Sequence, residues 1–194
     1  MPAVLQLARI LIETHRAREA LEVLAGAETH GASAIAIRLA LGQAQLGAGN
    51  AAAASATFRQ VLGAASRGPG GSAAPRDLRN LPELTAAHLG LAAALEGTGN
   101  VNGARAEVAL LTAASPLDPQ LAPRIAALLA RLGQRAEALA LYTELVTAGK
   151  ATPTTRVAAA RLALGLGQQR EARTFATQAV DEDPRTPGGL LLLA

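Results

Sequence analysis

Side chains that could carry out chemistry are few in this sequence and lie far apart. The chain has three histidines, His15, His30 and His88, and no cysteine. The lack of cysteine excludes disulfides, thiol catalysis and thiolate metal sites. A catalytic or metal site needs several such groups to converge in one pocket, and the three histidines fall at unrelated positions of the repeat described below. We therefore expect no metal, no cofactor and no enzymatic activity.

Two groups of carboxylates are the other candidates for acid–base chemistry. Glu13 and Glu19 are predicted to lie on separate helices, and the acidic run 181–183 stands at a predicted helix end beside Pro184. Acid–base catalysis requires groups held within hydrogen-bonding reach of one substrate. We interpret these carboxylates as solvated side chains.

The composition predicts an all-α protein. Half of the 194 residues are apolar and 48 are alanine, whereas the only aromatic residues are Phe58, Tyr142 and Phe175. Alanine, leucine and arginine favour helix, and the β-branched and aromatic residues typical of strands are scarce.

Charge and hydropathy exclude two classes of partner. The net charge is only +3, and the 17 arginines are scattered among 15 acidic residues. Nucleic-acid binding needs many phosphate contacts and aromatic platforms, so we expect no nucleic acid. No apolar run reaches the roughly 18 residues of a membrane span and no signal peptide is visible, so we expect no direct membrane insertion. The excess of arginine over the single lysine, Lys150, is typical of a GC-rich bacterial genome, and the lack of cysteine leaves both cytoplasm and periplasm open.

The chain repeats with a period of 34 residues. The pair Leu7-Ala8 recurs 34 residues later as Leu41-Gly42, then after a step of 50, and then after two further steps of 34. Twelve residues beyond each small residue stands an alanine, and a turn glycine precedes that alanine by five residues in every unit but the first, which has His15. The alanines are Ala20, Ala54, Ala104, Ala138 and Ala172, and the glycines are Gly49, Gly99, Gly133 and Gly167.

Each repeat is predicted to be a pair of helices joined at the turn glycine, which tolerates a positive φ. The expected units are about 1–34, 35–66, 85–118, 119–152 and 153–186, followed by the start of a sixth helix over 187–194, in one solenoid domain 1–194. Three pairs, Asp118-Pro119, Thr152-Pro153 and Thr186-Pro187, place a capping side chain before a proline and so predict helix starts. A bulky residue at Gly42 or Ala138 is expected to overpack the helix crossing and to cost about 1–3 kcal/mol.

The period, the small residue in each first helix, the turn glycine and the alanine of each second helix resemble the tetratricopeptide repeat (TPR) family. The large residues four positions after that alanine also match, as do Pro116 and Pro184, which close two units. The resemblance covers about 1–66 and 81–194. It implies an α-solenoid that forms a right-handed superhelix, whose first helices line a concave groove for a peptide. The family's aromatic and tyrosine positions in the first helix are not aromatic here, which predicts a thinner core.

The resemblance implies which side chains face the groove, because it assigns them by their phase in the first helices. The polar members are Arg9, Glu13, Gln43, Glu96, Arg131 and Arg161, and the wider set adds Ile12, Leu39, Leu46, Leu89, Ala93, Gln120, Ala127, Val157 and Leu164. The lysine and asparagine set with which some family members clamp a terminal carboxylate is absent. Arg131 and Arg161 are the best candidates to contact an acidic group of a partner, since guanidinium pairs with carboxylate bidentately.

Two segments depart from the repeat. The insertion 67–80 is rich in glycine and proline and is interpreted as a flexible loop, and its stretch 68–71 lacks the lysine of a phosphate-binding loop. The chain stops inside an expected sixth unit at the run Leu190, Leu191, Leu192 and Leu193. We interpret the chain as a fragment of a longer solenoid. The alternative is a natural terminus whose leucines cap the fifth unit or mediate self-association.

The sequence therefore predicts a non-enzymatic protein–protein interaction scaffold that binds a partner segment, peptide or another subunit, in a concave groove. A more specific alternative is a periplasmic segment of a bacterial exopolysaccharide (cellulose) or pilus secretion machine, acting as assembly scaffold or spacer. Carbohydrate binding would predict aromatic residues in the groove, and none is present. The partner, the compartment and the oligomeric state are left open.

Overall fold

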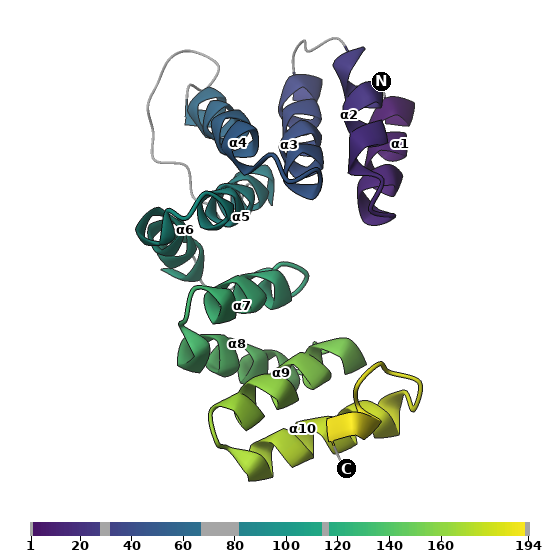
Figure 1. Ribbon diagram of the computed structural model, residues 1–194, viewed down its shortest axis with the longest axis vertical. Helices are drawn as coiled ribbons and strands as arrows, with labels where there is room; N and C mark the ends of the chain where they lie inside the picture. Colours follow the sequence, from purple (N-terminus) through teal and green to yellow (C-terminus); the bar gives the residue numbers. More distant parts are fainter. Residues whose placement is uncertain (1, 28–31, 67–81, 114–116, 193–194) are drawn as a thin grey trace. The chain divides into compact units, whose positions relative to one another are not determined.

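The structure is a computed structural model that describes residues 2–27, 32–66, 82–113 and 117–192, and within these residues it is all-α. The prediction of an α-solenoid of helical pairs is confirmed (Figure 1). The helices fall into two compact units, Met1–Pro116 and Leu117–Ala194. The boundaries of the repeats, and their continuity as one domain, stay predictions. No helix over the described residues has the length and apolarity to cross a membrane.

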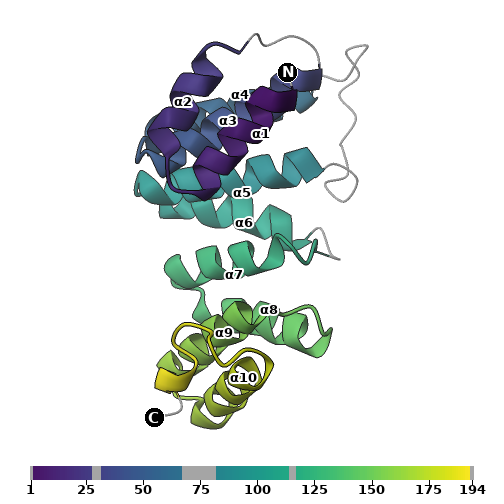
Figure 2. The ribbon, with the colours of Figure 1, turned by 90° about the vertical axis from the view of Figure 1, so that its right-hand side faces the viewer.

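The two helices of each repeat pair form an antiparallel hairpin around a short turn (Figures 1 and 2). Unit 1 contains α1 (Pro2–Glu13), α2 (Ala17–Ala25), α3 (Ala32–Gly47), α4 (Ala51–Ser66), α5 (Pro82–Gly97) and α6 (Val101–Ala113). Unit 2 contains α7 (Ala122–Arg131), α8 (Arg135–Thr147), α9 (Pro153–Gly165), α10 (Gln169–Glu182) and a 3-10 turn, Leu190–Leu192. The insertion 67–80 lies outside the described residues.

The hairpin turns use the left-handed backbone conformation that the repeat predicts. Gly49, Gly99, Gly133 and Gly167 have φ values of 82°, 79°, 85° and 77°, and His15, which replaces glycine in the first unit, has φ 60°. The turns share one hydrogen-bond pattern: Asn50 N donates to Gln45 O at 2.8 Å, as Arg16 N does to Leu11 O at 2.8 Å. His15 therefore adopts a conformation that costs an L residue more than glycine.

Small residues occupy the helix crossings. The alanines Ala20, Ala54, Ala104 and Ala138 are completely buried, and so are Ala8, Ala92, Ala126 and Ala160 of the first helices. Because a methyl group is all that separates the backbones at these positions, the helices approach closely. The repeat alanines therefore identify the core correctly from sequence.

A single aromatic ring joins two hairpins of unit 1. Phe58 of α4 is completely buried, and its ring lies against Gly42 of α3 and Gly90 of α5. A Cβ on Gly42 would be 2.7 Å from ring atoms Cε1 and Cζ, and a Cβ on Gly90 would be 2.7 Å from Cε2. Both distances are far below van der Waals contact, so the ring fits only because both residues are glycine.

The predicted helix starts are correct at one of three positions. Thr152 caps α9 by accepting a hydrogen bond from Thr155 N at 3.2 Å. The start expected at Asp118-Pro119 is wrong, because Asp118 instead caps a turn through Gln120 N at 2.9 Å and α7 begins at Ala122. Beyond Thr186-Pro187 the backbone turns at Gly188, with φ 80°, so that a 3-10 turn replaces the expected α-helix over the described part of 187–194.

We expect His15→Gly to raise the free energy of unfolding by about 0.5–1 kcal/mol, because glycine removes the cost of the positive φ. Gly99→Ala, at the same phase with open space around it, is expected to lower it by about 1–2 kcal/mol. Urea unfolding followed by circular dichroism measures both. A His15→Gly variant less stable than the parent would contradict the argument.

Gly90→Ala is expected to destabilise the chain by about 1–3 kcal/mol, because the added methyl would overlap the ring of Phe58. Combining it with Phe58→Leu should cost less than the sum of the two single changes, since the smaller side chain makes room. Gly63→Ala is the matched control: Gly63 lies in α4 with nothing near its Cβ, so alanine there should be neutral or stabilising by about 0.5–1 kcal/mol. Equal effects at Gly63 and Gly90 would refute the packing role of Phe58.

Candidate partner-binding site

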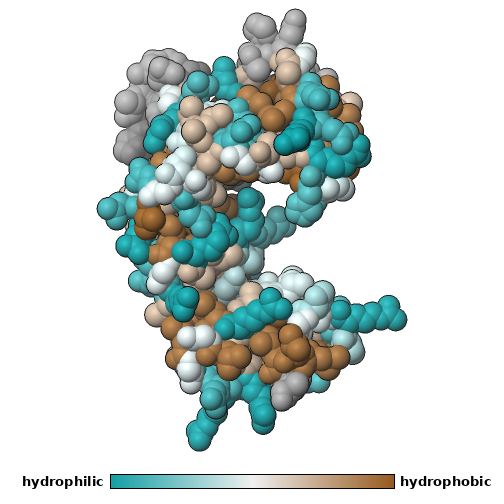
Figure 3. Space-filling view, in the orientation of Figure 1, coloured by the Kyte–Doolittle hydropathy of each residue, from teal (hydrophilic) through white to brown (hydrophobic). Residues whose placement is uncertain are grey.

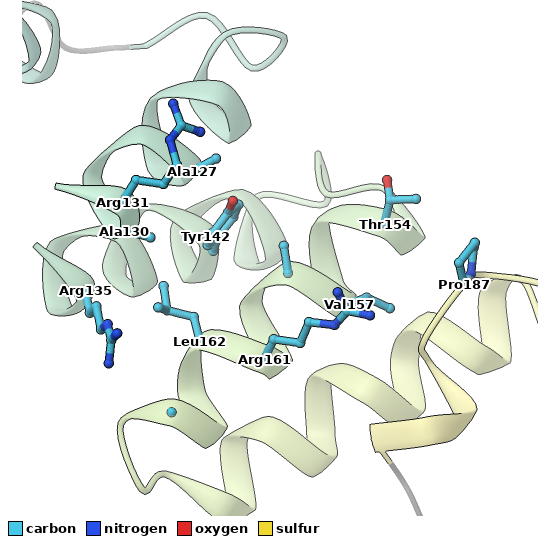
Figure 4. Close-up of a pocket in the computed structure, with 12 residues that line it drawn as sticks. Ala127, Ala130, Arg131, Arg135, Tyr142, Thr154, Val157, Arg161, Leu162 and Pro187 are labelled. Carbon is cyan, nitrogen blue, oxygen red and sulfur yellow. The ribbon is translucent and has the colours of Figure 1, made fainter. Parts of the chain in front are cut away.

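A pocket of about 720 Å³ opens on unit 2 between the helices α7, α8 and α9. Figure 4 shows Tyr142 at its centre, with α7 on one side and α9 on the other. Pro187, in the turn that follows α10, closes one edge. The pocket is therefore built by two successive hairpins and by the segment after the last helix.

The floor of this pocket is apolar. It consists of Ala127, Ala130, Val157, Ala158 and Leu162, together with the ring of Tyr142. Tyr142 is 5% exposed, and its hydroxyl donates to Pro123 O at 3.3 Å. Burial raises the pKa of the phenol, and the positive charge of Arg131 partly opposes this shift. The ring therefore stays neutral and offers an apolar face to an occupant.

Three arginines surround this floor, and the described residues that line the pocket include no carboxylate. Arg131 ends α7, Arg135 begins α8, and Arg161 lies in the middle of α9. In Figure 4 the three guanidinium groups lie at separate edges: Arg131 and Arg135 project in different directions, and Arg161 extends along α9 toward the turn with Pro187. The cations are thus spread around the floor and do not converge on one point.

The six predicted groove residues are distributed over both units. Arg131 and Arg161 line the pocket together, as do Ala127 and Val157 of the wider set. Arg9 and Glu13 lie on α1 in unit 1, where they form an exposed ion pair at 3.2 Å. Gln43 on α3 and Glu96 on α5 are half-buried. The structure thus brings together the two arginines with the strongest expectation, while the other four stay candidate groove residues.

Three residues of the wider set are buried, although a groove position predicts an exposed side chain. Leu39 and Leu89 are 9% and 3% exposed, and Val157 is 5% exposed. Leu39 and Leu89 belong to the core of unit 1, whereas Val157 also lines the pocket of unit 2.

Sequence reasoning missed Arg135 and the role of Tyr142. Arg135 lies in a second helix, whereas the groove residues were sought only in first helices. Tyr142 occupies the large-residue position of its unit and is buried there, at 5% exposed. Its position follows the repeat, but only the structure shows that one side of the ring faces the pocket.

The histidines and carboxylates of the described residues include no group of three that could hold a metal ion. His15 is an exposed turn residue, and His30 lies outside the described residues. His88 is half-buried, with Nδ1 at 2.6 Å from Oε2 of Glu107 on α6. The acidic run is only partly free in solvent, because Glu182 pairs with Arg156.

Apolar side chains lie exposed near the end of unit 2. Leu164, Leu190 and Leu191 are between 48% and 78% exposed, and Figure 3 shows apolar surface at the lower end of the view, over α9 and the C-terminal segment. Leu192 is half-buried, and Leu193 lies outside the described residues.

No protein-family model and no curated protein matches this chain. Solved structures do match, although at low identity. A thermophilic TPR protein from Thermus thermophilus is 19% identical with a TM-score of 0.70, covering 98% of this chain and 95% of that one. TPR-like repeats of a putative kinesin light chain from Podospora anserina are 20% identical with a TM-score of 0.68, covering 96% of each chain. YrrB, a TPR protein with an unusual peptide-binding site, is 16% identical with a TM-score of 0.57, covering 97% of this chain and 89% of that one. These likenesses establish a TPR fold.

Tyr142 is the single tyrosine of a chain without tryptophan, so its titration is read directly from phenolate absorbance. We expect a pKa above the ordinary value for tyrosine, and Arg131→Ala should raise it further because a nearby positive charge is lost. Since the folded-state pKa lies above that of the unfolded chain, the stability contribution is complete below the unfolded value and disappears as pH rises through the folded value. Arg135→Ala is the control and should leave the titration unchanged. A pKa that falls in Arg131→Ala would contradict this electrostatic assignment.

Proposed function

We propose that this chain is a protein–protein interaction scaffold that binds an extended acidic segment of a partner at the pocket of unit 2. The observation that carries the proposal is the lining itself, three arginines around an apolar floor with no carboxylate among them. A partner carboxylate would be the complementary charge there, and guanidinium is well suited to bind it.

The separation of the arginines supports a segment with spaced acidic groups over a small anion. Because Arg131, Arg135 and Arg161 lie at different edges of the floor (Figure 4), one phosphate-sized ligand would engage only one of them closely. A peptide with two acidic residues flanking an apolar one would place charge at two edges and bury the apolar side chain over Tyr142. Apolar contact at the centre with charge at the rim is typical of protein interfaces.

The remaining candidate contacts are proposed separately from the pocket. Arg9, Glu13, Gln43 and Glu96 are candidate partner contacts of unit 1 by itself, and Leu190 and Leu191 would offer an apolar surface for self-association. The TPR fold supports protein or peptide partners in general, and the solved structure of YrrB, a TPR protein with a peptide-binding site, is similar in fold.

The alternative function is a periplasmic assembly scaffold or spacer of an exopolysaccharide or pilus secretion machine. It rests on composition and on the repeat, and it makes a different prediction about the pocket. A spacer would contact neighbouring proteins at the ends of the repeat array. Charge reversal inside the pocket would therefore leave the set of captured proteins unchanged.

The test is binding of a short synthetic peptide with two glutamates flanking a leucine, free of tyrosine and tryptophan, followed through Tyr142 fluorescence. Arg131→Glu/Arg161→Glu is expected to lower the affinity at least about tenfold, which corresponds to about 1.4 kcal/mol. Arg170→Glu/Arg173→Glu, on exposed positions of α10 outside the pocket, makes the same charge change and should retain most of the affinity. Inorganic phosphate should not compete at comparable concentration.

Equal losses in the two double variants would reduce the effect to overall charge and would contradict a site at the pocket. Affinity capture from fractionated bacterial cells with the same pair of variants then separates the functions. Loss of captured proteins only in the Arg131→Glu/Arg161→Glu chain supports the scaffold with a pocket, and an unchanged set supports the spacer.

A further inference from the structure

The segment after α10 folds back over the last hairpin. Residues 184–189 form turns and lead into the 3-10 turn Leu190–Leu192. Figure 2 shows this yellow segment crossing over α9 and α10. Its middle part, residues 186–189, lies at the edge of the pocket, where Pro187 is a lining residue. We call residues 186–189 the strap.

Two glycines bring the strap into close contact with the groove face of α9. Gly188 lies directly against the guanidinium of Arg161, since a Cβ there would be 3.3 Å from Cζ and closer still to Nη2. Gly189 packs similarly against valines, with a Cβ position 2.8 Å from Cγ2 of Val180 and 3.8 Å from Cγ2 of Val157. The strap therefore touches Arg161 and Val157, two of the six residues of α9 that line the pocket.

The contact with Gly188 also accounts for the direction of Arg161. In Figure 4 the side chain of Arg161 runs along α9 toward the strap, and Tyr142 and the floor lie beside it. With the strap in place, Arg161 is held at the edge of the pocket. If the strap moved away, the guanidinium would be able to turn over the floor.

The hydrogen bonds of the strap are local. Thr186 N donates to Asp183 O at 3.0 Å, Gly189 N donates to Thr186 O at 3.2 Å, and Leu192 N donates to Gly189 O at 3.2 Å. These bonds connect the strap to itself and to the end of α10, and none of the three anchors it to α9. Packing contacts are what hold it down, and segments held in this way open at low free energy.

A buried hydroxyl also favours opening. Thr186 is 6% exposed, and its Oγ1 has no hydrogen-bond partner in the described part of the chain. A polar group buried without a partner is unfavourable, and it regains hydrogen bonds when it reaches water. The closed strap thus contains one contact that works against closure.

We propose that the strap is a displaceable cover of the partner site, which competes with the acidic segment for Arg161 and Val157 and must lift before that segment binds fully. This inference rests on the proposed function, because it assigns the regulation of the same pocket. Since only the open form binds, the apparent affinity is the intrinsic affinity multiplied by the open fraction.

Two opposite variants test the cover in the whole chain. Gly188→Ala adds a methyl that meets Arg161 at a residue with φ 80°, so it should open the strap and raise the affinity for the acidic peptide about three- to tenfold. Thr186→Val removes the unpartnered hydroxyl while keeping the shape, so it should close the strap and lower the affinity. Hydrogen exchange of the amides at 188–192 reports opening without any ligand, and it should speed up in the first variant and slow down in the second.

A disulfide provides a second control within one molecule. Because the chain has no cysteine and Gly189 lies against Val180, Val180→Cys/Gly189→Cys is placed to lock the strap on oxidation and release it on reduction. The oxidised form should bind the peptide more weakly than the reduced form.

The outcomes separate this inference from the proposed function. The cover is supported if the affinity for the peptide is highest in Gly188→Ala, lower in the parent and lowest in Thr186→Val, and if the oxidised disulfide variant binds more weakly than its reduced form. Measurable binding that is equal in all forms while hydrogen exchange changes would overturn the cover and leave the proposed partner site standing. Exchange rates that do not respond to either variant would overturn it too. Absence of peptide binding in every form, including Gly188→Ala, would overturn the proposed function and the cover with it.

Discussion

The close approach of neighbouring helices is the constraint on which the rest of this structure depends. Helices can pack with short interaxial distances only where the residues at the crossing are small, and the completely buried alanines of both units satisfy this condition. The most demanding instance is the ring of Phe58, which fits between α3 and α5 because Gly42 and Gly90 have no side chains. A core built in this way depends on close contact at these small residues.

Small side chains also shape the candidate site. In unit 2 the floor of the pocket is formed mainly by alanines, a valine, a leucine and one tyrosine. Short side chains leave a hollow between successive hairpins, whereas the arginines at its edge are long enough to reach around it. The site thus combines a shallow apolar surface with cations on different helices, and this arrangement selects an extended ligand over a compact anion.

The turn after α10 connects the end of unit 2 to this pocket. Glycine is favoured there for two reasons: the backbone at Gly188 is left-handed, and a Cβ at Gly189 would be only 2.8 Å from Cγ2 of Val180. These glycines interrupt the repeat pattern and bring the segment back over the groove face of α9. One local departure from the helical repeat therefore places this chain's own residues at the edge of its candidate partner site.

The sequence by itself determined the repeated helical hairpin. The 34-residue period, the small residues and the turn glycines predicted the all-α solenoid and the left-handed turns, because helix propensity, φ preference and side-chain volume act within a few residues of the chain. Phase within the repeat also selected Arg131 and Arg161, which the structure places around one pocket. The tertiary structure alone decided that Leu39 and Leu89 are core, that Arg135 and Tyr142 belong to the pocket, and that α7 begins after Asp118. It also decided that the segment after Thr186 folds back in place of a sixth α-helix. These outcomes depend on contacts between residues distant in sequence, or on the competition between a local cap and the packing of a whole hairpin. A repeat pattern in the sequence describes neither kind of interaction.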